Sequence, residues 1–313
     1  MRRGEHNRRG FLAAAGFGAA ALFGSGSLYA ADTPADAGSH VAINQWSVGA
    51  TRARDKKRPD MPLEEELAEL AACGINGLEP GVHSAEQVET LGATLKKHGL
   101  EMRSIYTGSD FVDPAAADKE IQRIVALAQQ AKSLGTRIIV TNPSPLPKRQ
   151  AKTDSQLTAQ AAGLNALGRE LAAHDLTLAY HNHDVELEHA AREFHHMLLG
   201  TDPANLSLCL DAHWVYRGAG HSAVALFDVV KLYGTRVVEL HLRQSQDKVW
   251  SESFGDGDID YRALWRTLSA VGAKPLLVLE QGPEQKTPQT IEPIESHRRS
   301  CRYAREVFSK RSA

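Results

Sequence analysis

Short apolar runs alternate with longer amphipathic segments along most of the chain. The short runs are rich in Val, Ile and Leu, which is typical of buried strands. The longer segments repeat their apolar residues every three or four positions, which is typical of helices. Glycines such as Gly74, Gly99 and Gly135 closely follow the longer segments, where a glycine commonly ends a helix. The pattern therefore predicts a regular strand–helix repeat.

The predicted elements can be placed by residue number. Four strands are expected at 41–46, 75–79, 102–106 and 137–141. Four more are expected to close at His181, Asp211, His241 and Glu280. Helices are expected at 62–72, 85–98, 115–133, 156–174 and 293–310, and the charged stretch 51–60 is expected to be a loop.

Eight strands that alternate with helices indicate an α/β protein with the (β/α)8 fold, a TIM barrel, as a single domain at residues 41–313. The length of this segment fits the usual size of such a barrel. A doubly wound open sheet is the alternative, but no Gly-x-Gly-x-x-Gly motif follows the first predicted strand. The sequence therefore favours closure.

Each of the four later strands is expected to end in a residue type that binds metals. His181, Asp211, His241 and Glu280 are separated by 30, 30 and 39 residues, each the length of a strand plus a returning helix. The carboxyl ends of barrel strands meet at one rim, so the four side chains are predicted to gather there. Taken singly, the aspartate could cap a helix and each histidine could be a core residue, but together they indicate a metal site.

The alternation of side chains along a strand predicts a second layer. Residues two apart on a strand share a face, so His183 and Arg243 are expected one layer above the four ligands. A buried carboxylate needs a partner, and Glu239 is therefore either a support for a ligand or a sign of a different register. The residues expected one layer below are Ala179, Cys209, Glu239 and Val278.

Two imidazoles and two carboxylates suit one divalent metal ion of borderline character. The candidates are Mn²⁺, Zn²⁺, Co²⁺, Fe²⁺, Ni²⁺ or Mg²⁺ rather than Ca²⁺. Four protein ligands at an open rim leave room for two substrate oxygens. The motif Gly255–Asp260 faintly resembles a Ca²⁺ loop, but it lacks the glutamate at the twelfth position and is interpreted as a tight turn before a helix at Tyr261.

The first 31 residues have the pattern of a twin-arginine export signal. Arg8 and Arg9 precede an Ala/Gly-rich apolar run of 16 residues, 13–28, which ends near small residues suited to cleavage. Because about 20 apolar residues are needed to span a bilayer, a stable membrane anchor is not favoured. We therefore expect residues 32–40 to be a linker, the Tat export machinery to be a partner, and the mature protein to be periplasmic or secreted.

Composition excludes some partners. The 313-residue chain is 42% hydrophobic and 24% charged, which is ordinary for a globular protein with a large core. Its formal charge is −2, and removing residues 1–30, with four Arg and one Glu, makes it −5, so nucleic acid is not an expected partner. Three cysteines do not indicate a disulfide framework in an exported protein.

Several motifs together resemble the xylose isomerase-like barrels, the sugar (phosphate) isomerase/epimerase family. They are Gly77–Pro80, Ser104–Tyr106, Tyr180–Asp184 with Glu186, Leu210–Trp214, His241–Arg243 and Gly255–Asp260. The resemblance covers nearly all of the chain after the signal. It implies a small carbohydrate substrate, a metal held by the four ligands, Glu280 as a proton-transfer base, and allows a homo-oligomer. The substrate-binding residues that it implies are Glu79, Tyr106, His213, Trp214 and Arg243.

The sequence departs from the epimerases of this family at one ligand. Those enzymes carry glutamates on strands five and eight, which exchange protons on opposite faces of the sugar, whereas His181 stands at the first position here. Glu280 is then the only carboxylate of the pair, and His183 or Glu186 is expected to supply a second proton-transfer group. Arg243 replaces the lysine often found after the strand-seven histidine and keeps the positive charge.

These residues predict an exported, metal-dependent sugar isomerase or epimerase that works through an enediolate. A β-elimination lyase or dehydratase on a keto-sugar, keto-inositol or 3-keto-glycoside is the alternative. A non-catalytic sugar-binding barrel is a further one, and a DNA endonuclease is disfavoured by the charge and the export signal. Trp46, Tyr106 and Trp214, at predicted strand ends, either stack on a sugar ring or form a hydrophobic lid.

Overall fold

The computed structural model describes residues 39–58 and 60–309, so the export signal predicted at 1–31 and most of the linker lie outside the described residues. Eight parallel strands form one sheet in the order β2-β1-β10-β7-β6-β5-β4-β3. The strands are β1 (Val41–Asn44), β2 (Gly77–Glu79), β3 (Ser104–Tyr106), β4 (Ile138–Thr141), β5 (Thr177–His181), β6 (Ser207–Asp211), β7 (Val237–Leu242) and β10 (Leu276–Leu279).

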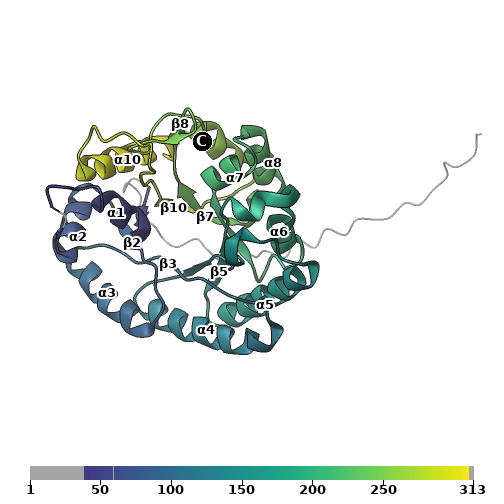
Figure 1. Ribbon diagram of the computed structural model, residues 1–313. Helices are drawn as coiled ribbons and strands as arrows, with labels where there is room; N and C mark the ends of the chain where they lie inside the picture. Colours follow the sequence, from purple (N-terminus) through teal and green to yellow (C-terminus); the bar gives the residue numbers. More distant parts are fainter. Residues whose placement is uncertain (1–38, 59, 310–313) are drawn as a thin grey trace, which may run out of the picture. The chain divides into compact units, whose positions relative to one another are not determined.

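The first and last strands pair, so the sheet curls into a barrel. β1 pairs with β10, and β2 and β3, at the two ends of the order, meet through backbone hydrogen bonds such as Leu78 N to Glu101 O and Val82 N to Tyr106 O, both 2.9 Å. Figure 1 shows the helices arranged around the outside of these strands. The predicted TIM barrel is confirmed.

Ten α-helices accompany the strands in the described part of the chain. They are α1 (Gln45–Arg52), α2 (Leu63–Ala72), α3 (Ala85–Lys97), α4 (Ala117–Ser133), α5 (Asp154–Ala172), α6 (Glu188–Leu199), α7 (Ala212–Gly218), α8 (Ala223–Tyr233), α9 (Tyr261–Ala270) and α10 (Pro293–Val307). Caps set their ends: Thr153 and Gln156 form a capping box at the start of α5, and Gly99, with φ of +68°, follows α3.

Three strand ends near the site differ by one or two residues from the predicted ones, since β1 ends at Asn44, β7 at Leu242 and β10 at Leu279. The first strand ends at Asn44 and not at residue 46, because the Asn44 side chain accepts a hydrogen bond from Trp46 N at 2.8 Å and starts α1. That helix also takes in the first two residues of the predicted loop 51–60. A small hairpin of β8 (Ser245–Gln246) and β9 (Val249–Trp250) follows β7, which explains the longer interval before Glu280.

Apolar side chains pack on both faces of the strands. The larger apolar layer lies between the strands and the helices, and a smaller one inside the barrel contains Val140, Ala179 and Cys209. The buried positions of Ala179 and Cys209 agree with the layer predicted beneath the four ligands. Cys73, Cys209 and Cys301 are buried and carry free thiols.

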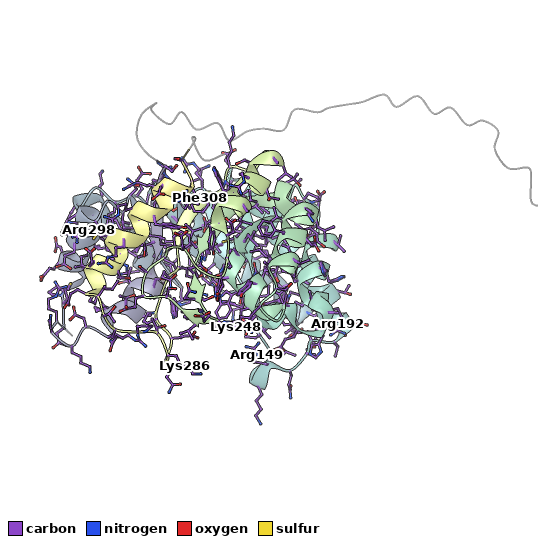
Figure 2. All side chains as sticks on the ribbon, turned by 90° about the horizontal axis from the view of Figure 1, so that it is seen from above. Arg149, Arg192, Lys248, Lys286, Arg298 and Phe308 are labelled. Carbon is purple, nitrogen blue, oxygen red and sulfur yellow. The ribbon has the colours of Figure 1, made fainter. Side chains whose placement is uncertain are left out.

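The loops that follow the carboxyl ends of the strands project from one side of the barrel. Arg149, Lys248 and Lys286, which follow β4, β7 and β10, mark this side in Figure 2, and Phe308 lies toward the other side. None of the helices in the described part of the chain combines the length and the apolar character that crossing a bilayer requires.

Candidate metal centre

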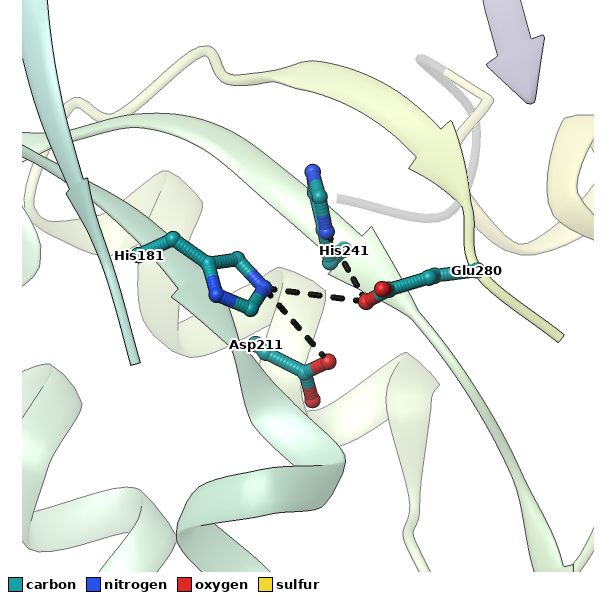
Figure 3. Close-up of side chains that lie close together, drawn as sticks. All are labelled: His181, Asp211, His241 and Glu280. Carbon is teal, nitrogen blue, oxygen red and sulfur yellow. Dashed lines mark hydrogen bonds and ion pairs between the residues drawn. The ribbon is translucent and has the colours of Figure 1, made fainter. Parts of the chain in front are cut away.

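The four predicted ligands come together at the carboxyl ends of their strands. One ligand atom from each of His181, Asp211, His241 and Glu280 lies within 4.8 Å of those of the other three (Figure 3). His181 Nε2 lies 3.8 Å from Asp211 Oδ2 and 3.6 Å from Glu280 Oε2, and His241 Nδ1 lies 3.0 Å from Glu280 Oε2. Parallel pairing produces this geometry, because Asp211 and His241 are register partners on β6 and β7.

The burial of this cluster fits a divalent cation. His181, Asp211 and His241 are fully buried, and Glu280 is 6% exposed. His181 Nε2 and Asp211 Oδ2 are buried polar atoms without a hydrogen-bond partner among the described residues, although they face each other. A cation between them would satisfy both atoms, and two nitrogens with two carboxylates suit a borderline divalent metal.

Asp211 has two roles at once. Its Oδ1 accepts a hydrogen bond from Trp214 N at 2.8 Å and so caps α7, which leaves Oδ2 directed at the cluster. The helix cap therefore fixes the carboxylate that would bind a cation. Burial raises the pKa of Asp211 to about 8, although the nearby Arg243 opposes this shift.

Arg243 joins the cluster from the layer above, as predicted from alternation. Its Nε donates to the Glu280 carbonyl at 2.9 Å, its Nη2 lies 3.2 Å from Glu280 Oε2, and its Nη1 lies 3.5 Å from Asp211 Oδ2. Burial alone would raise the pKa of Glu280, but the charges of Arg243 and His241 outweigh it and hold this pKa well below its usual range. Glu280 is therefore ionised near pH 7.

A buried pair of glutamates lies beneath His241. His241 Nε2 is 3.1 Å from Glu239 Oε1 and 3.2 Å from Glu79 Oε1. Asn44 Nδ2 donates to Glu79 at 2.6 Å and Ser104 Oγ donates to it at 3.2 Å. Glu239 thus has the partner that its depth requires, and the predicted register is correct. Because Nε2 faces these carboxylates, Nδ1 is the ring nitrogen directed at Glu280 and the cation position.

The two glutamates differ in charge. Burial, together with the charge of Glu79, raises the pKa of Glu239 to about 8. Burial would also raise the pKa of Glu79, but His241 and the hydrogen bonds around it lower this pKa to about 2. Glu79, an expected substrate-binding residue, has a fully buried carboxylate that contacts the His241 ring, and its substrate-binding role stays a prediction.

His183 and Glu186, the two expected second proton-transfer groups, lie differently. The ring of His183 packs between His181, at a centroid distance of 4.8 Å, and Trp214, at 5.7 Å. Burial, with the neighbouring His181, lowers the pKa of His183 to about 3, so this ring is neutral near pH 7. His183 therefore stands beside the cluster.

The carboxylate of Glu186 contacts the loops that follow β4 and β5. Its carboxylate accepts hydrogen bonds from His183 N at 2.7 Å and Asn142 Nδ2 at 3.2 Å, and Asn142 also donates to the His181 carbonyl at 3.0 Å. Burial raises the pKa of Glu186 to about 7. The hydrogen bonds of Glu186 thus support the turn after β5, and Asn142 links it to His181, while its expected proton-transfer role stays a prediction.

Two other expected substrate-binding residues are Tyr106, which contacts a residue of the cluster, and His213, which contacts the hairpin after β7. Tyr106 Oη lies 3.4 Å from His181 Nδ1, opposite the nitrogen that faces Asp211. His213 Nε2 lies 3.0 Å from Ser245 Oγ, which donates to Asp258 Oδ2 at 2.7 Å. The motif 255–260 is thus a turn that leads into α9, as predicted, and it also supports His213.

Trp250 is the residue of this region that sequence reasoning missed. It lies on β9, and its ring packs at a centroid distance of 6.0 Å from Trp46 and 5.5 Å from Trp214. A strand of two residues has no periodic pattern, so no signal in the sequence marked this position.

The sequence of this chain is similar to those of known proteins. A family model described as a xylose isomerase-like TIM barrel matches residues 67–306. An inosose dehydratase from Geobacillus thermodenitrificans is 24% identical over 281 residues, which cover 79% of this chain and 90% of that protein.

Two solved structures share the fold. A sugar phosphate isomerase/epimerase from Parabacteroides distasonis superposes with a TM-score of 0.70 at 17% identity, over 89% of this chain and 98% of that one. The 3-keto-D-glucoside 4-epimerase of E. coli superposes with a TM-score of 0.62 at 14% identity, over 86% and 99% of the two chains.

Proposed function

Because the chain belongs to the family of xylose isomerase-like TIM barrels, we propose that it is a divalent-metal lyase acting on a small keto-sugar or keto-cyclitol. In the proposed reaction a proton leaves the carbon beside the carbonyl, and an oxygen substituent leaves the next carbon. Its relatives are enzymes, among them inosose dehydratases, whose name describes the loss of water from an inosose.

One observation carries the choice of elimination: the ligand contributed by β5 is the imidazole of His181 and not a carboxylate. Epimerisation with two glutamates needs a base on each face of the reacting carbon, whereas Glu280 is the only glutamate among the four residues of this cluster and the one base that we propose. Elimination needs one base and a proton for the leaving oxygen, which this arrangement supplies.

Each residue of the cluster has a distinct part in the proposed reaction. A divalent cation held by His181, Asp211, His241 and Glu280 would polarise the substrate carbonyl and make the neighbouring C–H more acidic. The contacts from His181, His241 and Arg243 all reach Oε2 of Glu280, which leaves Oε1 to take the proton. Arg243 supplies a fixed positive charge beside the oxyanion that develops.

The bonds and protons balance without a further reactant. The C–H bond and the C–O bond on the next carbon break, and a C=C bond forms between the two carbons. The proton taken by Glu280 passes to the leaving oxygen, either directly or through the neutral ring of His183. The products are an unsaturated ketone, or its diketone tautomer, and water or an alcohol.

Isomerisation or epimerisation is the second candidate, and the position of His183 favours it. Its ring lies 4.8 Å from that of His181, one of the four residues of the cluster. If His183 returned the proton to carbon, the same enediolate would give an epimer or an isomer. No C–O bond would break in that case, and the product would have the same composition as the substrate.

Export is part of this proposal. The twin-arginine pattern in residues 1–31 supports passage through the Tat machinery to the periplasm or the exterior. A periplasmic enzyme meets unphosphorylated sugars and glycosides, which agrees with a substrate that carries no phosphate. Fractionation of cells that produce the full chain tests this step.

Product analysis distinguishes the two reactions. We suggest incubating the full-length protein, loaded with Mn²⁺, with 2-keto-myo-inositol, with 3-keto-glucosides and with ketohexoses, and following the reaction by proton NMR. Elimination predicts loss of the α-proton signal together with a new unsaturated or diketone product. An epimer with no eliminated product would replace the lyase assignment, and no change with any ketone would overturn both.

A further inference from the structure

Three of the four tryptophans of the chain surround Arg243. The guanidinium carbon lies 4.4 Å from the ring centroid of Trp250, 4.9 Å from that of Trp214 and 5.2 Å from that of Trp46. The same guanidinium contacts Glu280 and Asp211. We call Trp46, Trp214 and Trp250 the tryptophan group, and it is joined to the metal ligands through one side chain.

Exposure increases outward through this group. Trp250 is 6% exposed, Trp214 is half-buried, and Trp46 is 46% exposed. Trp46 stands in the first turn of α1, directly after β1, on the rim where the ligands lie. An indole left this exposed beside a buried charged cluster provides an apolar surface that begins at the site and leads away from it.

The inner part of the group is held rigidly. Glu284 accepts a hydrogen bond from Trp250 N at 2.8 Å, and Thr287 donates to the Trp250 carbonyl at 2.8 Å. Arg217 binds both oxygens of Glu284 at 3.1 and 3.2 Å and lies 4.7 Å from the Trp250 ring centroid. The surface is therefore formed before a ligand arrives, which lowers the cost of binding.

The chain also makes room for Trp46. A Cβ placed on Gly282 would lie 2.7 Å from Cζ3 of Trp46 and 2.9 Å from its Cη2. Such contacts are too short, so the indole can hold this position only because residue 282 is glycine. Gly282 follows Glu280 by two residues and makes none of the contacts that form the metal cluster.

Two hydrogen-bond donors remain unused in the group. Nε1 of Trp214 and Nε1 of Trp250 are buried without an acceptor among the described residues. Nε1 of Trp265, outside the group, is in the same state, so these N–H groups alone do not identify a ligand. The aromatic surface itself indicates a ligand, because the flat faces of a sugar or aryl glycoside suit indole rings.

We propose that the tryptophan group binds a second ring of the substrate, joined to the reacting keto-sugar by a glycosidic oxygen. This inference rests on the proposed function for the role of that oxygen, which is the leaving group. Loss of the proton beside the carbonyl breaks the adjacent C–O bond, forms the C=C bond, and releases the second ring as an alcohol. The substrate is thus a keto-glycoside, and water is not the main product.

Binding of unreactive glycosides tests this subsite without turnover. The probes are methyl β-D-glucoside and phenyl β-D-glucoside, measured by saturation-transfer NMR and calorimetry on the full-length protein with Mn²⁺. Contacts with aromatic rings predict that the phenyl glucoside binds about two to ten times more tightly than the methyl glucoside. The Trp46→Ala variant should bring this ratio close to one.

Two further variants and one control distinguish loss of a specific aromatic subsite from a general loss of protein structure. Trp46→Phe keeps an aromatic face and should keep most of the ratio, whereas Gly282→Ala should lower it because the indole must move. Trp265→Phe, on α9 against Phe308, should leave the ratio unchanged. Equal binding of the two probes by the natural protein, or an unchanged ratio in both Trp46→Ala and Gly282→Ala, would overturn the proposal.

The methyl and phenyl 3-keto-glucosides then test the reaction separately from binding. Faster elimination from the phenyl derivative than from the methyl derivative supports both the subsite and the lyase. A binding preference for the phenyl glucoside without elimination from either derivative would leave the subsite in place and overturn the lyase. Elimination from both derivatives at equal rates, with equal binding of the two glucosides, would support the lyase and overturn the subsite.

Discussion

His241 Nε2 lies 3.1 Å from Oε1 of Glu239, the residue two positions earlier on the same strand. Both side chains are fully buried, and Glu79 reaches the same nitrogen from β2. A histidine that binds a metal commonly presents its other nitrogen to a carboxylate, which fixes the ring and raises its basicity. The pair of glutamates therefore prepares His241 to bind a cation through Nδ1.

The first prediction concerns this pair. Replacing Glu79 with Gln should weaken Mn²⁺ binding by about 10- to 100-fold, because supports of this kind contribute that much to metal affinity. Glu239→Gln should have a smaller effect, because the raised pKa of Glu239 already keeps it neutral near pH 7 and a glutamine resembles its protonated form. Calorimetric titration with Mn²⁺ measures both affinities.

The exposed Glu89 of α3 provides a control for these variants. Glu89→Gln should bind Mn²⁺ like the natural protein. Equal affinities for the natural protein and Glu79→Gln would show that the contact to His241 Nε2 does not support a metal ligand.

The second prediction concerns metal removal. A bound ion stabilises the folded state, by about 2.7 kcal/mol at 100 times its Kd. In a domain of this size we expect EDTA to lower the melting temperature by about 5 to 10 °C and excess Mn²⁺ to restore it. Differential scanning calorimetry with and without the ion measures the shift.

His181→Ala should abolish that shift, since it removes one of the four ligands. His83→Ala, which changes an exposed imidazole, should keep it. If the His181→Ala protein still gained stability from Mn²⁺ as the natural protein does, the ion would bind elsewhere.

The third prediction concerns pH. Burial raises the pKa of Glu186 to about 7, above its ordinary value, so the folded protein keeps a proton there that the unfolded chain has already lost. The folded state then binds more protons, and its stability falls as pH rises through this window. From pH 5 to pH 8 we expect a loss on the order of 2 to 3 kcal/mol from this group.

Glu186→Gln should remove the part of the slope that Glu186 contributes and leave the parts from Asp211 and Glu239, whose pKa values are also raised, because glutamine does not ionise and can still accept the hydrogen bond from His183 N. Urea unfolding at pH 5, 6, 7 and 8 measures the slopes. Glu170→Gln, at an exposed position of α5, should show the slope of the natural protein. A slope in Glu186→Gln equal to that of the natural protein would show that Glu186 does not contribute to the pH dependence.

The sequence was sufficient to predict the barrel and the four gathered ligands, because both follow from a simple rule. Strands buried on both faces produce apolar runs, and a ligand at the end of each run lands on the same rim. His181, Asp211 and His241 needed no knowledge of side-chain directions to be placed together. The layer beneath them followed from alternation, which also placed Glu239 and Arg243.

The parts that could not be predicted depend on contacts between distant segments. Glu79 ends β2, and its placement under His241 follows from its pairing with Asn44 across the strands. Glu186 follows β5 closely, yet its carboxylate turns back to the His183 amide. Trp250 reaches Arg243 through a hairpin of two-residue strands, and spacing in the sequence carries no information on that approach.

The central claim is that Glu280, one of four groups around a divalent cation, removes a proton beside a substrate carbonyl. Its most direct test is proton exchange in D₂O with Glu280→Gln, supplied with saturating Mn²⁺ and shown by atomic absorption to hold it. The natural protein should exchange the α-proton of its keto-sugar substrate, and the variant should exchange it about 10² to 10⁴ times more slowly. Exchange at the natural rate by the metal-loaded variant would contradict the account.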